Sequence, residues 1–367
     1  MIEYIVIALL LLAAELAYFK IADKCNIIDK PNERSSHSTI VLRGGGVIFA
    51  ISMVIWLILQ MVKGEWLTVQ GYMPFMCGLM LICGVSFWDD VKSLPDSVRL
   101  VAQFAAMALM GWCMFGVQDS WFMVLDWYWK VAIIIAALIV CVGATNIINF
   151  MDGINGITAA YSLAVLVPLA LVNGFSTSEV AEPSARLTVQ DSEAVGFIEP
   201  SFLFVAIIGV LVFCIFNFRP KGKAKCFAGD VGSIGIAFIM LFALGMLIVQ
   251  TGDLTYLVFL LIYGVDGVLT ICHRIMLHEN LGQAHRKHAF QLMSNELNIG
   301  HVTVSLIYMV LQLIVSLGFI YLCPNTIVAH WIYLVGVGFV LAVAYILFMM
   351  KYYHLHEEYL ASLEARK

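Results

Sequence analysis

Long apolar segments constrain this chain more than any other feature. A helix that crosses a bilayer needs about 20 mostly apolar residues. Such windows fall near residues 2–22, 44–62, 70–88, 98–117, 130–150, 154–174, 200–218, 230–250, 254–272, 300–322 and 328–350. Only 12% of the residues are charged and the mean hydropathy is +0.94, whereas soluble proteins are about a quarter charged. The sequence therefore predicts an all-α polytopic integral membrane protein with about eleven transmembrane helices. We expect one transmembrane domain over residues 1–350 and a short cytoplasmic tail at 351–367.

Basic residues predict the orientation of these helices. Most lysines and arginines lie in alternate connections or in the tail, which leaves Lys63, Lys130 and Arg186 for the other side. Because basic loops stay in the cytoplasm, we expect a periplasmic N-terminus and a cytoplasmic C-terminus. The opposite loop at 175–199 is acidic, with Glu179, Glu182, Asp191, Glu193 and Glu199.

The chemically capable residues gather on the predicted cytoplasmic side. They lie in "DKPNERSSHSTIVLRGGG", "WDDVKSLPDSVRL", "NIINFMDGINGI", "NFRPKGKAKCFAGDVGS" and "HRIMLHENLGQAHRKHAFQ". A secondary transporter, the rival class, would place such residues near mid-membrane and show internal repeats. The one-sided pattern favours a membrane enzyme. The nine cysteines form no CxxC pair, so neither a disulfide framework nor a zinc site is predicted.

Several carboxylates stand where a helix end disfavours them. Asp89 and Asp90 end the third predicted span and Asp152 ends the fifth. A carboxylate at a helix C-terminus is disfavoured by about 0.3–1 kcal/mol, so these positions suggest a compensating cation. The alternatives are an ion pair between Lys92 and Asp89, and a helix cap for Asp230, which opens the eighth span. Asp266 lies within the ninth span, where an acid is a functional candidate unless it pairs with Arg274.

Three glycine-rich or basic motifs suggest contacts to a polar ligand. "NFMDGINGI" offers Asn149, Asp152 and Asn155 for a base or sugar edge. "RGGG", which begins at Arg43, is typical of a phosphate-binding helix start or of close helix packing. "AHRKH" supplies His285, Arg286, Lys287 and His288, which favour phosphate or lipid headgroups. Hard oxygen ligands beside basic side chains describe a site for Mg²⁺, or for Mn²⁺, that carries out phosphoryl transfer.

In this order, the five segments resemble those of the polyprenyl-phosphate N-acetylhexosamine-1-phosphate transferases, the WecA/MraY superfamily. The likeness covers about residues 20 to 295. "AHRKHAFQ" is similar to the O-antigen and capsule initiators that resemble WbpL, whereas the cell-wall branch (MraY) has three consecutive histidines. The family often has a proline three positions before the aspartate of the ninth span and Arg-Arg after it. Here Tyr263 and His273-Arg274 stand at these positions.

The resemblance implies an Mg²⁺-dependent enzyme of the bacterial inner membrane. Undecaprenyl phosphate attacks the β-phosphorus of a UDP-N-acetyl sugar, releases UMP and initiates a surface glycan such as O-antigen, capsule or a teichoic-type polymer. The cell-wall phospho-MurNAc-pentapeptide reaction is the alternative. The resemblance implies metal ligation by Asp230 and Asp89, catalytic roles for Asp89, Asp90, Asp230, His285 and His288, and nucleotide recognition by Asn149, Asp152 and Asn155. Arg43, Lys92 and Arg286 complete the predicted substrate contacts. We expect no nucleic-acid partner, and a homodimer is compatible with the family.

The charge of the acceptor narrows these roles. A phosphate monoester has a second pKa of about 6, so it needs relief of charge repulsion more than a general base. Because successive helical residues project about 100° apart, Asp89 and Asp90 cannot both face one metal. We expect Asp230 to be the direct ligand and one of the pair to be held by Lys92 or by a backbone donor. The cytoplasmic loop 273–298 is where we expect the sugar to be selected.

Overall fold

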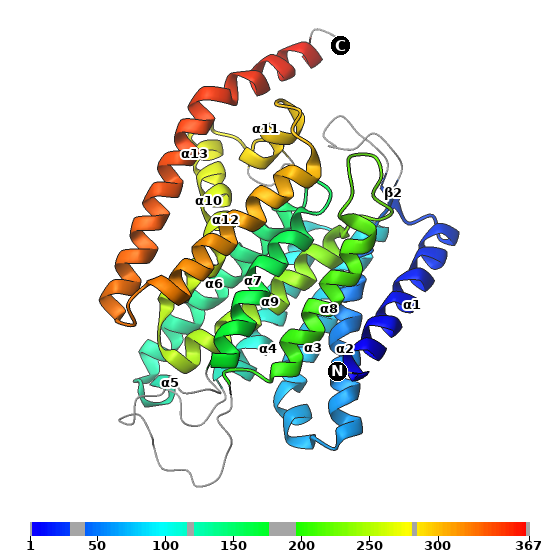
Figure 1. The fold of residues 1–367 in the computed structure, drawn as a ribbon, viewed down its shortest axis with the longest axis vertical. Helices are drawn as coiled ribbons and strands as arrows, with labels where there is room; N and C mark the ends of the chain where they lie inside the picture. The colour runs from blue at the N-terminus through cyan, green and yellow to red at the C-terminus, as the bar shows by residue number, and fades with distance from the viewer. Residues whose placement is uncertain (1, 30–40, 116–120, 176–195, 281–284, 365–367) are drawn as a thin grey trace.

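The protein is a bundle of helices in which the site residues come together at one end (Figure 1). The computed structural model describes residues 2–29, 41–115, 121–175, 196–280 and 285–364. Its elements are α1 (Ile2–Lys24), β1 (Ile28–Asp29), β2 (Val41–Leu42), α2 (Val47–Lys63), α3 (Trp66–Val91), α4 (Asp96–Phe115), α5 (Trp121–Val124), α6 (Trp127–Met151), α7 (Ile157–Phe175), α8 (Pro200–Asn217), α9 (Gly229–Thr251), η2 (Leu254–Leu260), α10 (Leu261–Met276), α11 (Ala289–Asn295), α12 (His301–Leu322) and α13 (Ile327–Glu364).

Each predicted apolar window coincides with a helix. In the described part of the chain, ten helical segments are long and apolar enough to cross a membrane. The window at 44–62 is α2, which is apolar but has only 17 residues. The architecture is therefore that of a polytopic α-helical membrane protein. The β-structure in the described residues is one short antiparallel ladder between β1 and β2 and a parallel bridge between Leu42 and Cys226.

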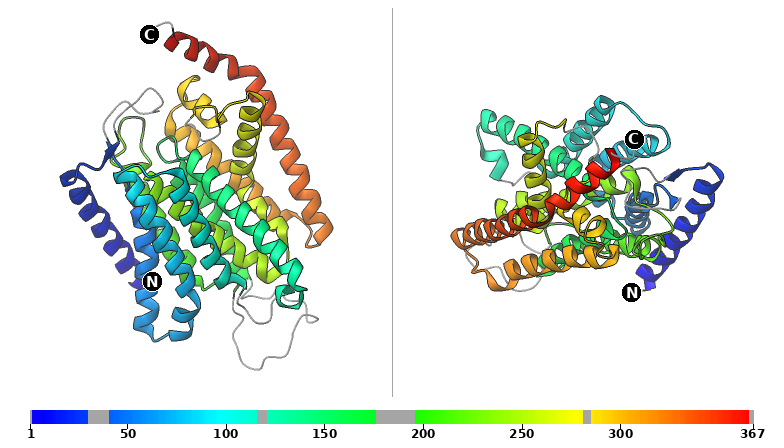
Figure 2. Two further views of the ribbon diagram at one scale, coloured as in Figure 1. Left: turned by 180° about the vertical axis from the view of Figure 1, so that it is seen from behind. Right: turned by 90° about the horizontal axis from the view of Figure 1, so that it is seen from above.

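Helix α9 lies at the centre of the bundle. It is buried along most of its length and packs against α2, α3, α4, α6 and α7, whereas α13 lies at the edge (Figures 1 and 2). Phe75 of α3 stacks on Phe238 and Phe242 of α9, with ring centroids 5.5 and 4.2 Å apart. Buried apolar contacts of this kind fix the depth of α9, and its first turn consequently lies beside the end of α3.

The glycine run before α2 serves close packing. A Cβ on Gly46 would collide with the backbone of Gly232 in α9. The amides of Gly45 and Gly46 donate to the carbonyls of Phe227 and Ala228, at 2.9 and 3.1 Å. These amides are therefore committed to the protein, and the packing alternative for "RGGG" replaces the phosphate cradle. The contact brings Arg43 to the start of α9.

Helix α13 is longer than a membrane requires. It has 38 residues, about 57 Å at 1.5 Å per residue, against a hydrocarbon core of about 30 Å. Residues 351–364, predicted as a tail, continue this helix beyond the end of the bundle (Figure 2).

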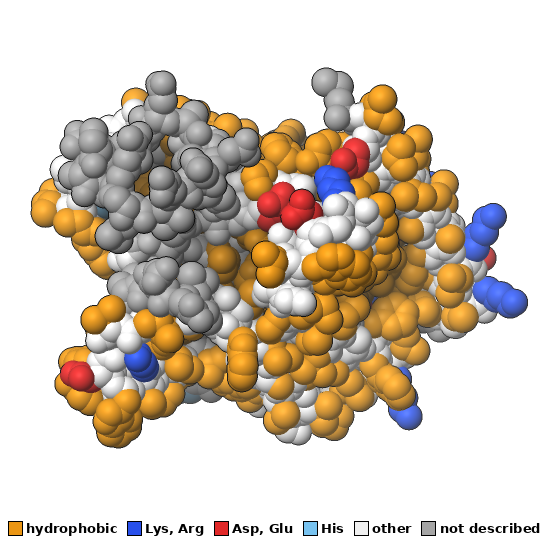
Figure 3. Space-filling model, turned by 90° about the horizontal axis from the view of Figure 1, so that it is seen from below, with side chains coloured by type: hydrophobic (Ala, Val, Ile, Leu, Met, Phe, Trp, Pro, Cys, Tyr) orange, Lys and Arg blue, Asp and Glu red, His pale blue; other side chains and the backbone are white. Residues whose placement is uncertain are grey.

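The two ends of the bundle differ in character. α11, β2 and the α8–α9 connection lie at one end, and α5 lies at the other (Figure 1). In the view onto the α5 end, hydrophobic side chains dominate the visible surface, with scattered charges (Figure 3). Some residues used in the sequence predictions fall outside the described residues. These are Lys30 and Arg34, which count among the basic residues of the predicted cytoplasmic connections, and Glu179, Glu182, Arg186, Asp191 and Glu193 of the opposite loop.

Candidate active site

Asp90 is the anchor of the acidic centre. Its side chain is fully buried, and Arg43 Nε lies 2.7 Å from Oδ1. The backbone amides of Asp230 and Val231 donate to Oδ1 and Oδ2, at 2.9 and 3.0 Å. Asp90 thus satisfies the first amides of α9, where the helix dipole favours an anion. One member of the pair is held by backbone donors, as predicted, and the helix cap is Asp90 rather than Asp230.

Asp89 and Asp230 form the more open half of the centre. Their side chains are in hydrogen-bonding contact with each other, and Asp89 Oδ1 accepts the amide of Leu94 at 2.6 Å. Arg99 lies 3.4 Å from both Asp89 Oδ2 and Asp230 Oδ2, and Arg43 lies 3.8 Å from Asp230 Oδ1. Burial opposes the charge of Arg43, but Asp90 and Asp230 outweigh it and raise its pKa.

Arg99 takes the place that the sequence assigned to Lys92. Lys92 is exposed and makes no ion pair among the residues described, so the proposed Lys92–Asp89 pair is wrong. Arg99 was missed because it lies ten residues after Asp89 along the chain. The available signal was its position in the first turn of α4, three residues after Asp96, with which it also pairs at 3.8 Å.

The donor set can be tested against a metal ion. Within the described residues no group of three or more His, Cys, Asp or Glu side chains is placed to hold one. Mg²⁺ in phosphoryl-transfer sites uses one or two carboxylates and takes further oxygens from phosphate and water. The facing carboxylates of Asp89 and Asp230 fit that pattern, and they would leave the other positions around a cation to phosphate and water.

The end of α6 borders this centre. Ser233 of α9 donates to Asn149 Oδ1 at 2.7 Å. Asp152 follows the last turn of α6 and accepts the Thr158 hydroxyl at 2.5 Å. Burial raises the pKa of Asp152 to about 6, against the effect of the Thr158 hydrogen bond. Asn149 is therefore close to the carboxylates, and Asp152 lies one turn further along.

Asn155 supports this loop instead of facing a ligand. It is 2% exposed, and its Nδ2 donates to the carbonyls of Arg219 and Pro220 at 2.9 and 3.0 Å. Both side-chain hydrogens are used within the protein, so the geometry favours a positioning role over the predicted ligand contact. The bonds tie the loop after α6 to the loop before α9.

The histidine motif lies on the other side of the α6 end. The rings of His285 and His288 are 4.9 Å apart, and Phe150 is 6.3 Å from His285. Burial, followed by His288 and Arg274, lowers the pKa of His285 to about 3. His288 Nδ1 lies 3.1 Å from Asp266 Oδ1. Asp266 does not pair with Arg274, which instead contacts Glu279 at 3.1 Å.

The two basic residues of "HRKH" are held by other parts of the protein. Arg286 bonds the Tyr359 hydroxyl at 3.1 Å and lies 4.9 Å above its ring. Lys287 pairs with Glu279, which lowers the pKa of that carboxyl against the effect of burial. The substrate contact predicted for Arg286 is therefore not the contact seen here. Within the motif, His285 contacts α6 and His288 lies beside it.

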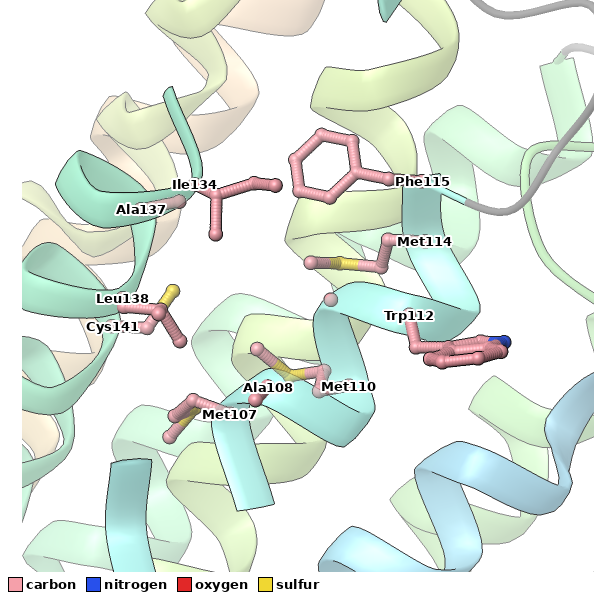
Figure 4. A pocket seen from close by; sticks show the side chains of 11 residues that line it. Met107, Ala108, Met110, Trp112, Met114, Phe115, Ile134, Ala137, Leu138 and Cys141 are labelled. Carbon is pink, nitrogen blue, oxygen red and sulfur yellow. The ribbon is translucent and has the colours of Figure 1, made fainter. Parts of the chain in front are cut away.

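An apolar cavity of about 340 Å³ lies between α4 and α6. Met107, Met110 and Met114 line it from α4, and Ile134, Ala137 and Leu138 line it from α6 (Figure 4). Met107 is eight residues from Arg99, about 12 Å along the helix at 1.5 Å per residue. The cavity thus lies further along the two helices that border the charged centre, toward the α5 end of the bundle.

Fold and site together define a multi-pass membrane protein with a one-sided acidic and basic centre suited to phosphate chemistry. The chain matches the family model "Glycosyl transferase family 4" over residues 72–248. It is 26% identical over 227 residues to a probable undecaprenyl-phosphate N-acetylglucosaminyl 1-phosphate transferase of Bacillus subtilis, covering 60% of this chain and 55% of that protein. It is 23% identical over 224 residues to a phospho-N-acetylmuramoyl-pentapeptide-transferase of Lactococcus lactis subsp. cremoris, covering 57% of this chain and 60% of that protein.

A third relative is the phospho-N-acetylmuramoyl-pentapeptide-transferase of Moorella thermoacetica, 29% identical over 132 residues, which are 36% of this chain and 32% of that protein. The chain matches a little over half the length of the first two relatives. These matches confirm the resemblance to the WecA/MraY superfamily, and residues 72–248 match the model of glycosyl transferase family 4.

Proposed function

We propose that this protein transfers an N-acetylhexosamine 1-phosphate from a UDP-sugar to undecaprenyl phosphate in the bacterial inner membrane. A lipid phosphate oxygen attacks the sugar-bearing phosphorus, the bond to the bridging oxygen breaks, and UMP leaves with that oxygen. The observation that carries the proposal is the convergence of Asp89, Asp90 and Asp230 with two arginines at one end of a membrane bundle, next to paired histidines.

The residues of the charged centre, together with Asn149, have distinct roles in this reaction. Asp90 fixes Arg43 and the first turn of α9, so it positions the centre. Arg43 and Arg99 offset the negative charge of two phosphate-bearing substrates, and they align them for an in-line attack. Asn149, near the carboxylates, is available to the nucleotide. Asp89 and Asp230 would hold Mg²⁺, which supplies charge neutralisation when bound.

The acceptor lipid needs an apolar path as well as a charged end. The nearest lining residue of α4, Met107, lies about 12 Å from Arg99 by the helical rise, and the α4–α6 cavity is lined mainly by apolar surface. Under this proposal it takes part of the polyprenyl chain. An Ala137→Trp variant fills it, and we expect a KM for undecaprenyl phosphate at least about tenfold higher. Ala136→Trp on the exposed side of α6 is the matched control.

Release of UMP by purified protein tests the reaction. We expect release to require a UDP-sugar, undecaprenyl phosphate and Mg²⁺, and to stop with a chelator. A panel of UDP-GlcNAc, UDP-GalNAc, 6-deoxy sugars and UDP-MurNAc-pentapeptide identifies the donor, since the relatives carry the names of both branches. If no UMP is released with any of these donors, the result would contradict the proposal and favour a transporter.

The role of the metal is tested separately. Asp230→Asn should lose activity and the response to Mg²⁺ together, since it removes one facing carboxylate. Asp89→Asn should lose activity at all pH values. A loss confined to pH below about 6, where the lipid phosphate takes up its proton, would show that Asp89 acts as a base.

A further inference from the structure

A buried hydrogen-bond cluster lies beside the proposed nucleotide side of the site. At its centre is Asp266 of α10, which is 3% exposed. Its Oδ2 accepts the Tyr308 hydroxyl of α12 at 2.5 Å. Its Oδ1 faces the Thr270 hydroxyl at 3.1 Å, the Ala289 amide at 3.3 Å and His288 Nδ1 at 3.1 Å. A carboxylate that accepts this many bonds holds its neighbours in one geometry.

The cluster determines which nitrogen of His288 is left for a ligand. His288 Nδ1 lies 3.1 Å from Asp266 Oδ1, and the His288 side chain also caps the start of α11 through the backbone of Gln291, so Nδ1 is committed to the protein. Nε2 is then directed away from Asp266. It is buried, His288 is 1% exposed, and Nε2 has no hydrogen-bond partner among the residues described. A buried polar atom without a partner costs about 1–3 kcal/mol and marks the place of an absent one.

The surroundings identify the class of that partner. The ring of His288 lies 4.9 Å from that of His285 at a tilt, and His285 contacts Phe150 beside Asn149 at the end of α6. Gly153 lies against Phe290 and Gln291 of α11, where a Cβ would be 3.0–3.1 Å from their side chains. The histidine cluster and the loop that carries Asp152 are therefore in contact. A ligand bound at this loop would therefore lie beside the histidine cluster.

We propose that Asp266 and Tyr308 are positioning residues that aim His288 Nε2 at a phosphate oxygen of the nucleotide. This inference rests on the proposed function and deepens it. With Nδ1 committed to Asp266 and to the start of α11, Nε2 is the nitrogen left to donate to the phosphate. Mg²⁺ prefers oxygen ligands, so the phosphate and not the cation is the partner of this nitrogen.

Binding of UMP and of uridine to the purified protein separates this role from a structural one. We expect Asp266→Asn and His288→Gln each to weaken UMP binding at least about tenfold, measured by calorimetry, and to leave uridine binding unchanged. Tyr308→Phe should act in the same direction with a smaller effect. Because Asp266 acts through His288, Asp266→Asn should add nothing in the His288→Gln background.

A matched control exists at the other end of the bundle. Asp253 and His330 form a similar pair, with Nδ1 2.6 Å from Oδ2, and Asp253→Asn should leave UMP binding unchanged. Equal losses for UMP and uridine, or additive losses in the double variant, would overturn the positioning role while the proposed function stands. Failure of the unaltered protein to bind UMP would contradict the proposed function itself.

Discussion

At the scale of single residues, adjacent aspartates have different roles. Asp90 faces the start of α9 and binds Arg43, whereas Asp89 faces Arg99 and Asp230. The sequence predicted this division from the angle between successive helical residues. It could not identify Arg99, because the direction of a side chain at a helix start depends on how α3 and α4 pack. Residue types predicted the chemistry, and packing determined the partners.

The buried position of Asp90 predicts a large effect on stability. Asp90→Ala removes an anion that satisfies Arg43 and two amides, and breaking a buried pair costs about 3–5 kcal/mol. We expect a lower thermal midpoint in detergent by fluorescence-monitored unfolding. Asp96→Ala is the matched control, since the Asp96 side chain is 88% exposed and exposed pairs contribute about 0–1 kcal/mol. Equal midpoints for the two variants would contradict the anchoring role.

Asp152 predicts a pH-dependent effect. Its pKa is raised to about 6 by burial, so the folded protein holds this proton more tightly than the unfolded chain. The stability that it contributes is complete below about pH 4 and is lost as the pH rises through 6. Asp152→Asn should therefore gain stability relative to the unaltered protein between pH 5 and 7.5. Asp23→Asn, at an exposed position on α1, should show no such trend. A constant difference at both pH values would refute this prediction.

At the scale of elements, the end of α13 packs against the histidine motif, and we call its contact residues Tyr353, His356 and Tyr359 the clasp. Tyr353, His356 and Tyr359 recur every three residues along one side. Lys287 lies 5.8 Å above the ring of Tyr353, Arg286 bonds Tyr359, and His356 Nδ1 lies 3.1 Å from Glu296 Oε1. The sequence placed 351–367 in a tail because local hydropathy ends there. The clasp depends on contacts between distant segments, which hydropathy does not report.

The clasp predicts an effect on the sugar nucleotide. His356→Ala removes the bond to Glu296 and loosens the segment that carries His285 and His288. We expect the KM for the UDP-sugar to rise about three- to tenfold, with the KM for undecaprenyl phosphate unchanged, in steady-state assays of UMP release. His354→Ala is the matched control, because His354 is exposed two residues away. If both variants behave alike, the clasp has no role in donor binding.

At the scale of the whole molecule, the spans were predictable and the site only partly so. Apolar length is a local property, and each predicted window coincides with a helix. Asn149, Asp152 and the three aspartates could be named as candidates because polar residues at membrane boundaries are conspicuous. The scaffold role of Asn155 and the engagement of Arg286 were not predictable, since both depend on loops that meet only in the folded chain.

The predicted orientation has a direct test with two natural cysteines. Cys25 follows α1 at the end that carries the site, and Cys323 follows α12 at the other end. In single-cysteine variants, a membrane-impermeant maleimide added to intact spheroplasts should label Cys323. Cys25 should react only after permeabilisation. The reverse pattern would place the site outside and contradict the predicted topology.

The arrangement around Asp90 also bears on how the protein is assembled. Arg43, Asp89, Asp90 and Arg99 all precede the end of α4, so the first part of the chain can neutralise its own charges as it is synthesised. α9 is made some 130 residues later, and its amides and Asp230 then join a neutral receptor. Four of the five charged residues of this group can therefore pair before α9 is made, and the centre is completed only when Asp230 arrives.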